Sequence, residues 1–152
     1  MIPLADLVTV VPTITAGSYA SGKIVGNAQA ITLPVMPSNL QAGILENLAV
    51  LDNANQAAPL TLIFFSVKPT VVDTASFAWS ASIPFANVLG IFNVLNADYV
   101  VLNSKAMVSY HGISMALKAA AGQTVYVVVV TTGTPTYGTV HDLTFLYGMM
   151  AG

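Results

Sequence analysis

The chain has 152 residues, of which only four are basic and six acidic, and its net charge is −2. Charged residues make up 7 % of the sequence, against about 25 % in an ordinary soluble domain, so we expect much of the surface to be covered by other protein in a permanent assembly. The lack of a basic cluster argues against a nucleic-acid partner, the absence of cysteine excludes disulfides and thiolate chemistry, and the longest strictly apolar run, residues 125–130, is too short for a membrane-spanning helix.

Short β-prone runs separated by turn residues dominate the sequence, which is the pattern of an all-β sandwich or barrel. The first run, residues 7–15, is interrupted at Pro12. Proline cannot donate a ladder hydrogen bond, so its presence indicates an edge position or a bulge. Two weaker runs follow at residues 19–25 and 28–35, with a turn predicted between them.

Residues 44–52 and 59–67 are the strongest pair of predicted strands, joined by a small polar loop. Side chains alternate between the two faces of a strand, and in the second run both faces are largely apolar. Because a two-layer sandwich covers only the inner face, the outer cover must be a loop or a neighbouring subunit. We therefore predict Ile63 and Phe65 as subunit-interface residues.

Residues 83–90 depart from this pattern and predict one or two helical turns. Ser82 could cap the helix, Pro84 suits its first turn, and Gly90 suits the position just after its end. Strands are expected to resume at residues 97–103, 107–111, 113–117, 124–132 and 140–149. An amphipathic helix over residues 105–121 is the alternative for part of this region.

About eight to ten strands in one domain predict an all-β fold, a jelly-roll-like antiparallel β-sandwich with one short helical segment near residues 83–90. An immunoglobulin-like sandwich fits the strand count and the helical turn less well. We assign residues 16–152 to a single β-sandwich domain. Residues 1–15, apolar and interrupted by proline, are a possible N-terminal interaction arm, and its predicted interface side chains are Leu7, Val10 and Ile14.

No group of side chains predicts an active site, so we expect a protein that is not an enzyme and needs neither cofactor nor metal. His141 and Asp142 are adjacent, but neighbours along a strand point to opposite faces, so Asp142 cannot orient His141 as a base. Asp52 and the asparagines after it offer oxygens to calcium, yet further acidic ligands are missing and a polar hairpin loop is the preferred interpretation.

Two further features bear on partners rather than on catalysis. Glu46 lies inside an apolar run, and we expect it to point outward or to pair with a lysine across a subunit contact. The tyrosines and Trp79 could stack sugars, but Tyr and Trp are also enriched at protein–protein interfaces, and an interface or core role is preferred.

The order of segments resembles that of capsid decoration (cement) proteins of tailed bacteriophages. The stretches that carry this similarity are residues 48–52, 59–65, 68–70, 83–90, 126–130 and 142–148. The resemblance spans residues 44–150 and includes no diagnostic motif. It implies a β-sandwich that trimerises on the outside of a head shell and clamps neighbouring copies of the major capsid protein. It also implies synthesis in the host cytoplasm and a final location on the capsid exterior of the virion.

A carbohydrate- or receptor-binding β-sandwich of a phage tail or fibre is the main alternative, and it predicts a solvent-open aromatic platform around Trp79 or Tyr137. An outer-membrane β-barrel would also explain apolar outer faces, but such barrels have polar interiors, which residues 59–67 do not provide. We therefore expect protein partners and a homo-oligomer, with neither nucleic acid nor membrane as a partner.

Overall fold

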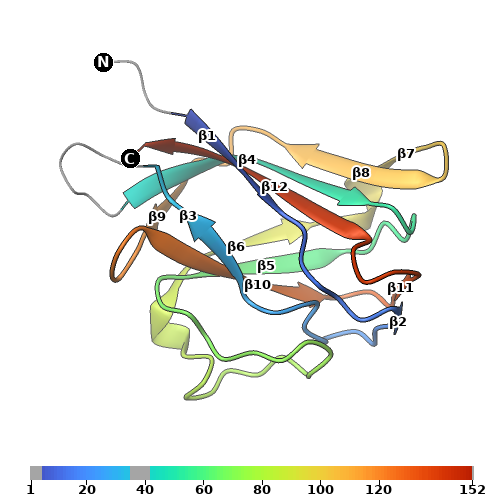
Figure 1. Cartoon of the computed structure of the whole chain (residues 1–152), viewed down its shortest axis with the longest axis horizontal. Helices are drawn as coiled ribbons and strands as arrows, with labels where there is room; N and C mark the ends of the chain where they lie inside the picture. Colours follow the sequence, from blue (N-terminus) through green and yellow to red (C-terminus); the bar gives the residue numbers. More distant parts are fainter. Residues whose placement is uncertain (1–4, 35–41, 152) are drawn as a thin grey trace.

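A computed structural model describes residues 5–34 and 42–151, which form two large antiparallel β-sheets packed face to face and a third, two-stranded sheet (Figure 1). The strands are β1 (Ala5–Val10), β2 (Gly17–Ser18), β3 (Gln29–Thr32), β4 (Ala42–Asp52), β5 (Leu60–Phe65), β6 (Val88–Val94), β7 (Val100–Leu102), β8 (Lys105–Tyr110), β9 (Met115–Lys118), β10 (Thr124–Thr131), β11 (Thr136–Tyr137) and β12 (Leu143–Ala151). Two single turns of 3-10 helix, η1 (Phe85–Asn87) and η2 (Asn96–Asp98), are the only helical segments in these ranges. Neither turn approaches the length and apolarity that a membrane-crossing helix requires.

The strand order identifies a jelly roll. One sheet has the order β1-β12-β4-β8-β7, and β9 also pairs with β4; the other has the order β3-β10-β5-β6. β8 and β9 pair with successive parts of β4, so they act as one interrupted strand. When they are counted as one and the short β2, β7 and β11 are left out, the strands follow the orders 1-8-3-6 and 2-7-4-5, with every pair antiparallel. This is the double Greek key of jelly-roll domains. The predicted fold class is confirmed.

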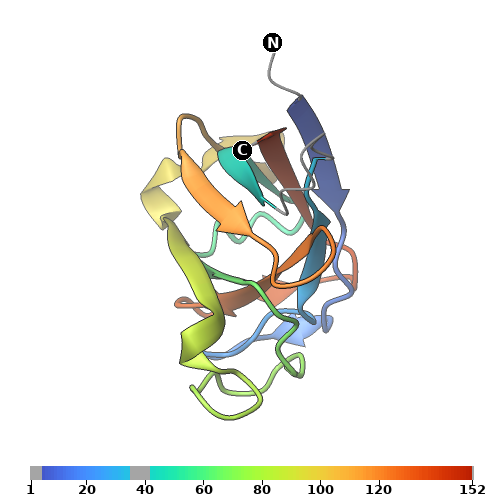
Figure 2. The same cartoon turned by 90° about the vertical axis from the view of Figure 1, so that its left-hand side faces the viewer.

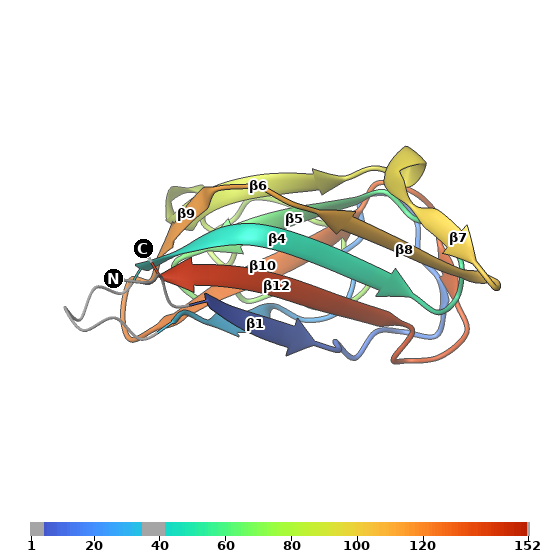
Figure 3. The same ribbon diagram turned by 90° about the horizontal axis from the view of Figure 1, so that it is seen from above.

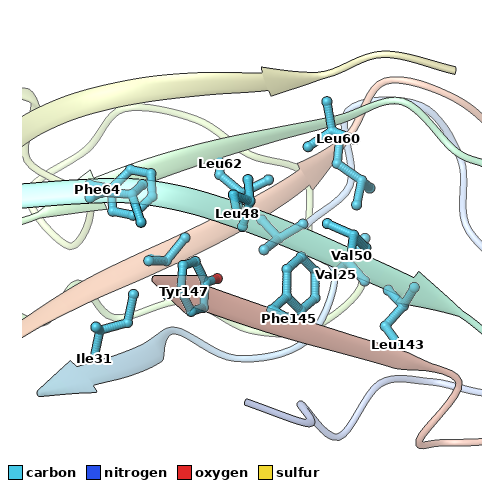
Figure 4. Close-up of a cluster of buried hydrophobic side chains, with 14 of the residues drawn as sticks. Val25, Ile31, Leu48, Val50, Leu60, Leu62, Phe64, Leu143, Phe145 and Tyr147 are labelled. Atoms are coloured by element: carbon cyan, nitrogen blue, oxygen red, sulfur yellow. The ribbon is translucent and has the colours of Figure 1, made fainter. Parts of the chain in front are cut away.

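The core fills the space between the two sheets with the inward side chains of alternating positions (Figure 4). Phe145 and Tyr147 of β12 pack with Phe64 of β5, and the rings of Phe64 and Tyr147 meet edge to face at 6.3 Å. The phenol of Tyr147 donates a 2.7 Å hydrogen bond to Oε1 of Gln29, which satisfies its one polar group inside the core.

The helical prediction for residues 83–90 is confirmed only as the single turn η1, and its details were wrong. Pro84, not Ser82, occupies the N-cap, and no side chain caps the turn. Gly90 lies inside β6, where a Cβ atom would come within 2.7 Å of the Met115 sulfur. Gly90 therefore makes room for the Met115 side chain of β9 and does not end a helix. The alternative helix over residues 105–121 was also wrong, since β8 and β9 occupy that stretch.

The segment between β5 and β6, residues 66–87, runs across the outer face of the β3-β10-β5-β6 sheet (Figures 1 and 2). It closes a second apolar cluster, whose buried members are Ile24, Ile63, Phe65, Ile83, Val128 and Val130. We call residues 66–87 the cover segment. Its presence explains why β5 and β10 are buried on both faces, as their apolar sequences predict.

Asp73 fixes the cover segment to the start of the chain. Its carboxylate accepts hydrogen bonds from the Thr15 hydroxyl at 2.6 Å, the Tyr19 phenol at 2.6 Å and the Gly26 backbone N–H at 2.7 Å. Burial, together with the bond to Asp73, raises the pKa of Tyr19 to about 12. The cover is therefore held by directed hydrogen bonds as well as by apolar packing.

Candidate functional site

The other sheet carries a broad outer surface that the described part of the chain leaves uncovered, seen from above in Figure 3. The residues of this surface follow from the strand pairing. Directly opposed residues share a face, and Val50, Phe145 and Tyr147 point into the core, so the residues on the other face of these strands point outward. We call this surface the open face. Its outward side chains are Leu7, Thr9, Ile44, Glu46, Asn47, Ala49, Leu51, Val100, Leu102, Lys105, Met107, Ser109, Ala116, Lys118, Thr144, Leu146, Gly148 and Met150.

Apolar side chains line up across neighbouring strands of the open face. Leu51 of β4 lies opposite Met107 of β8, which lies opposite Val100 of β7, so these three form one row. Leu146 of β12 and Ala49 of β4 form part of the next row. The first row ends at Thr144, and the second row ends at Thr9 and Ser109. An apolar patch of this kind on the outward face of a sheet indicates an interaction site.

The β7–β8 hairpin forms one end of the open face. Asn103 and Ser104 both have positive φ, 48° and 62°, as a two-residue turn of type I′ requires. Leu102, beside this turn, has 64 % of its surface exposed. Val101, which points to the opposite side, is exposed as well, so the hairpin extends past the packed sandwich with apolar groups on both faces.

A shallow acidic hollow lies near the other end of the open face. Gly148 of β12 stands opposite Asn47, and the register shifts between Gly148 and Met149, which leaves Glu46 as an extra residue on β4. A hollow of about 390 Å³ lies beside Gly148, and we call it the glycine slot. It is lined by Asp6, Leu7, Glu46, Asn47, Gly148, Met149 and Met150.

Glycine at position 148 lets the Asn47 side chain pack closely against the backbone of β12. A Cβ atom on Gly148 would come within 2.9 Å of the Asn47 Cβ, too close without movement of β4. The Glu46 carboxylate is held nearby by a 3.1 Å hydrogen bond from the Ser114 hydroxyl, which leaves its second oxygen outside that bond. The sequence singled out Glu46 but not Gly148, because only the pairing register reveals the neighbour of a glycine.

The five predicted interface residues lie in different environments. Ile63 and Phe65 are 3 % and 0 % exposed beneath the cover segment, so an intrachain contact takes the place of the subunit contact predicted for them. Ile14 is 2 % exposed in the core and Val10 packs against that core. Leu7 alone keeps most of its surface in solvent, 62 %, and lies at the glycine slot.

The predicted N-terminal arm is described only from residue 5 onward. Residues 5–10 form β1, which pairs with β12 at the edge of the sheet, in keeping with the edge position that Pro12 indicated. Residues 1–4 lie outside the described residues. A reach of this segment toward a neighbouring subunit stays a prediction.

The acidic residues weighed for catalysis or metal binding serve the loops instead. Both Asp52 oxygens accept backbone N–H bonds, from Ala54 at 2.9 Å and from Gln56 and Ala57 at 2.8 and 3.0 Å. Burial nevertheless raises the pKa of Asp52 above its usual range. Within residues 5–34 and 42–151, no three His, Asp or Glu side chains gather in a way that could hold a metal ion.

His141 and Asp142 lie in the turn before β12 and not within the strand that the sequence predicted for them. The Asp142 carboxylate accepts bonds from the backbone N–H groups of Gly138 and Thr139, at 2.7 and 2.9 Å, and from the Thr139 hydroxyl at 2.8 Å. Burial alone would raise the pKa of Asp142, but these hydrogen bonds outweigh it and lower the pKa. Asp142 therefore fixes the turn before β12, and His141 is exposed.

An aromatic cluster lies on the cover segment, away from the open face. Trp79 meets Phe77 and Phe85 edge to face, with ring centroids 5.0 and 5.1 Å apart, and both Trp79 and Phe85 are exposed. Tyr137, the other candidate for a sugar-stacking platform, is buried against Tyr19. Of the two residues predicted to form a sugar-stacking platform, Trp79 has an exposed ring and Tyr137 does not.

No known protein family matches the chain, and no curated protein matches it either. Among solved structures, the chain is similar to a chain from a structure of Desmodium yellow mottle tymovirus, with a TM-score of 0.29 and 10 % identity over 99 % of this chain and 82 % of that one. Similarity at this level does not bear on function. The assignment of the jelly roll rests on the strand order of the chain itself.

Proposed function

We propose that the chain is a structural protein of a virion, and specifically a decoration (cement) protein that binds the major capsid protein and stabilises the shell from the outside. The observation that carries this proposal is the open face, an apolar sheet surface on a jelly roll with very few charges. A permanent assembly removes such a surface from water, and obligate interfaces resemble a core cut in half.

Three features support a structural role over a catalytic one. Jelly rolls build many viral capsid domains as well as lectins. The carboxylates of Asp52, Asp73 and Asp142 are occupied by hydrogen bonds that fix loops. The low number of charges suits a subunit that is always surrounded by protein more than a freely diffusing monomer.

The oligomer that we propose is a trimer formed through the open face. Native mass spectrometry of the purified chain tests this first, and the expected species is a stable trimer. Mixing that species with empty heads of the phage that encodes the chain tests the decoration role, with occupancy read by electron microscopy. A folded monomer that leaves the heads bare would overturn the proposal.

The exposed rings of Trp79 and Phe85 favour one alternative, a carbohydrate- or receptor-binding sandwich of a phage tail or fibre. Tryptophan faces are common stacking surfaces for apolar sides of ligands. Glycan-array binding that is lost in Trp79→Ala would support this alternative. Absence of glycan binding together with decorated heads would leave the shell role.

A further inference from the structure

We propose that the β7–β8 hairpin of one copy docks into the glycine slot of a second copy, with Leu102 entering the slot and Lys105 pairing with Glu46. This inference rests on the proposed function in one respect, assembly through the open face. It adds the occupant of the slot and the residues that make the contact.

The charges on the open face are arranged for a contact between copies. Lys105 lies at the hairpin end beside Ala106, and Ala106 pairs with Asp52 of β4. Glu46 lies six residues before Asp52 on β4, at the slot. At 3.3 Å per residue, Asp52 and Glu46 are about 20 Å apart along β4, so Lys105 and Glu46 of the same chain cannot meet. The same two groups on different copies carry opposite charges and are complementary.

The shapes are complementary as well. Leu102 is held at the end of a rigid two-residue turn with 64 % of its surface exposed, and Val101 and Met107 beside it are also exposed. The slot offers apolar walls from Leu7 and Met150. An apolar side chain enclosed by apolar walls with an ion pair at the rim is the common arrangement of a protein interface.

The position of these two parts allows two types of contact. The β7–β8 turn and the chain termini lie at opposite ends of the molecule in Figure 3. The slot is lined by residues of β1 and of the last part of β12, so it lies at the end opposite to the hairpin. Two such patches can meet twice across a twofold axis, which gives a dimer, or once per neighbour in a heterologous contact, which closes into a ring when the rotation between neighbours allows it. A ring of three copies accords with the proposed trimer, with each copy giving one hairpin and receiving another.

Charge reversal tests the ion pair. Lys105→Glu and Glu46→Lys should each weaken self-association about tenfold or more in sedimentation equilibrium, and the double variant should recover most of the loss because the pair is restored with opposite sense. Lys68→Glu is the matched control, since it reverses an exposed lysine of the cover segment and should leave association unchanged.

Removal of the apolar contact tests the docking of Leu102. Leu102→Ser should dissociate the oligomer, whereas Val72→Ser, which alters an equally exposed side chain at 65 % on the cover segment, should not. Both positions are on the surface, so each variant should keep the wild-type thermal transition when measured as a monomer. Near-ultraviolet circular dichroism from Trp79 checks that each variant is folded.

The outcomes separate this contact from the proposed function. A wild-type oligomer that tolerates both charge reversals and Leu102→Ser would overturn the hairpin–slot contact, while decorated heads would still support the shell role. Conversely, association that fails in the single variants and returns in the double variant supports the contact even if heads stay bare. Loss of association on deletion of residues 1–4, with the charge variants unaffected, would assign the slot to the N-terminal segment and overturn the proposal.

Discussion

The two outer faces of the sandwich are made from similarly apolar strands but end in opposite environments. Over β5 and β10 the cover segment buries both faces, so burial is nearly continuous along each strand. Along β12 and β4 buried and half-buried positions alternate, apart from the bulge at Glu46 and Asn47, although Leu51, Leu146 and Met150 on the outward positions are as apolar as their counterparts. One face is completed within the chain, and the other has apolar side chains with no cover from the described residues.

This difference separates stability from assembly. Side chains under the cover segment contribute to folding of the single chain, because they leave water when the chain folds. Side chains on the open face gain little until another protein removes them from water. Substitutions on the two faces should therefore affect different measurements.

The largest effect is expected from a pair of substitutions, one on each face. Phe65→Ala, under the cover, should lower the free energy of unfolding by about 3–5 kcal/mol, because it removes a fully buried ring. Leu7→Ala, on the open face, should change it by less than about 0.5 kcal/mol but weaken self-association. Urea titration at low protein concentration measures the first quantity, and sedimentation the second.

Ile63→Val provides a milder version if Phe65→Ala does not fold, with an expected cost of about 0.5–1.5 kcal/mol. Equal losses of stability on the two faces would contradict the comparison. It would mean that the open face is already covered within the single chain.

The attachment of the cover segment is the next point to test. Asp73→Ala removes the acceptor for Thr15, Tyr19 and Gly26, and an unsatisfied buried group costs about 1–3 kcal/mol. We expect the cover to open locally before the sandwich unfolds. Hydrogen exchange should then accelerate at Ile24 and Thr74, whose N–H groups bond across this junction at 2.8 Å.

Asp98→Ala is a matched control, because Asp98 also accepts a bond from a tyrosine, Tyr110, at 2.6 Å but on the surface away from the cover. Exchange at Ile24 and Thr74 should be the same as in the wild type for this variant. If Asp73→Ala leaves exchange at these amides unchanged, packing alone holds the cover segment.

The sequence was enough to predict the fold class, most strands and the double burial of residues 59–67, because alternation and turn residues are local signals. It could not predict what covers that strand, since loop and subunit are equally consistent with an apolar face. The strand β6 was missed for a related reason. Gly90 looks like a helix end by sequence, and its contact with Met115 depends on a residue 25 positions away.

The same limit applies to the candidate site. The apolar and isolated charged residues of the open face are visible in the sequence, and Glu46 was expected to face outward or to meet a lysine. The slot beside it arises from the pairing of Gly148 with Asn47, which are distant in sequence. Register between distant strands is set by the whole sheet, so no local pattern contains it.

A smaller effect concerns Asp142, which fixes the turn leading into the sheet of the open face. Asp142→Asn should lower the free energy of unfolding by about 1–3 kcal/mol at neutral pH through loss of charge-assisted bonds from Gly138 and Thr139. The pKa of Asp142 is lowered in the folded chain, so its contribution is complete above the ordinary aspartate pKa of about 3.9 and is lost as the pH falls through the folded value. Thermal melts of both proteins between neutral and acidic pH should therefore converge in acid. A difference that stays constant down to strongly acidic pH would show that the carboxylate charge does not hold the turn.

The smallest effect tests the interior that both faces share. Tyr147→Phe removes the 2.7 Å bond to Gln29 and should cost about 1 kcal/mol at pH 7. Burial raises the pKa of Tyr147 well above its ordinary value of about 10, so in alkali the phenol ionises in the unfolded chain while it stays protonated in the folded one. The free energy of unfolding of the wild type then falls as the pH rises above about 10. Tyr147→Phe has no phenol at this position, so its free energy of unfolding does not fall for this reason. Urea midpoints measured from neutral to alkaline pH should show the difference between the two proteins shrinking and then reversing. A constant difference would mean that water reaches the phenol of Tyr147, and that the packing between the two sheets is looser than the core described here.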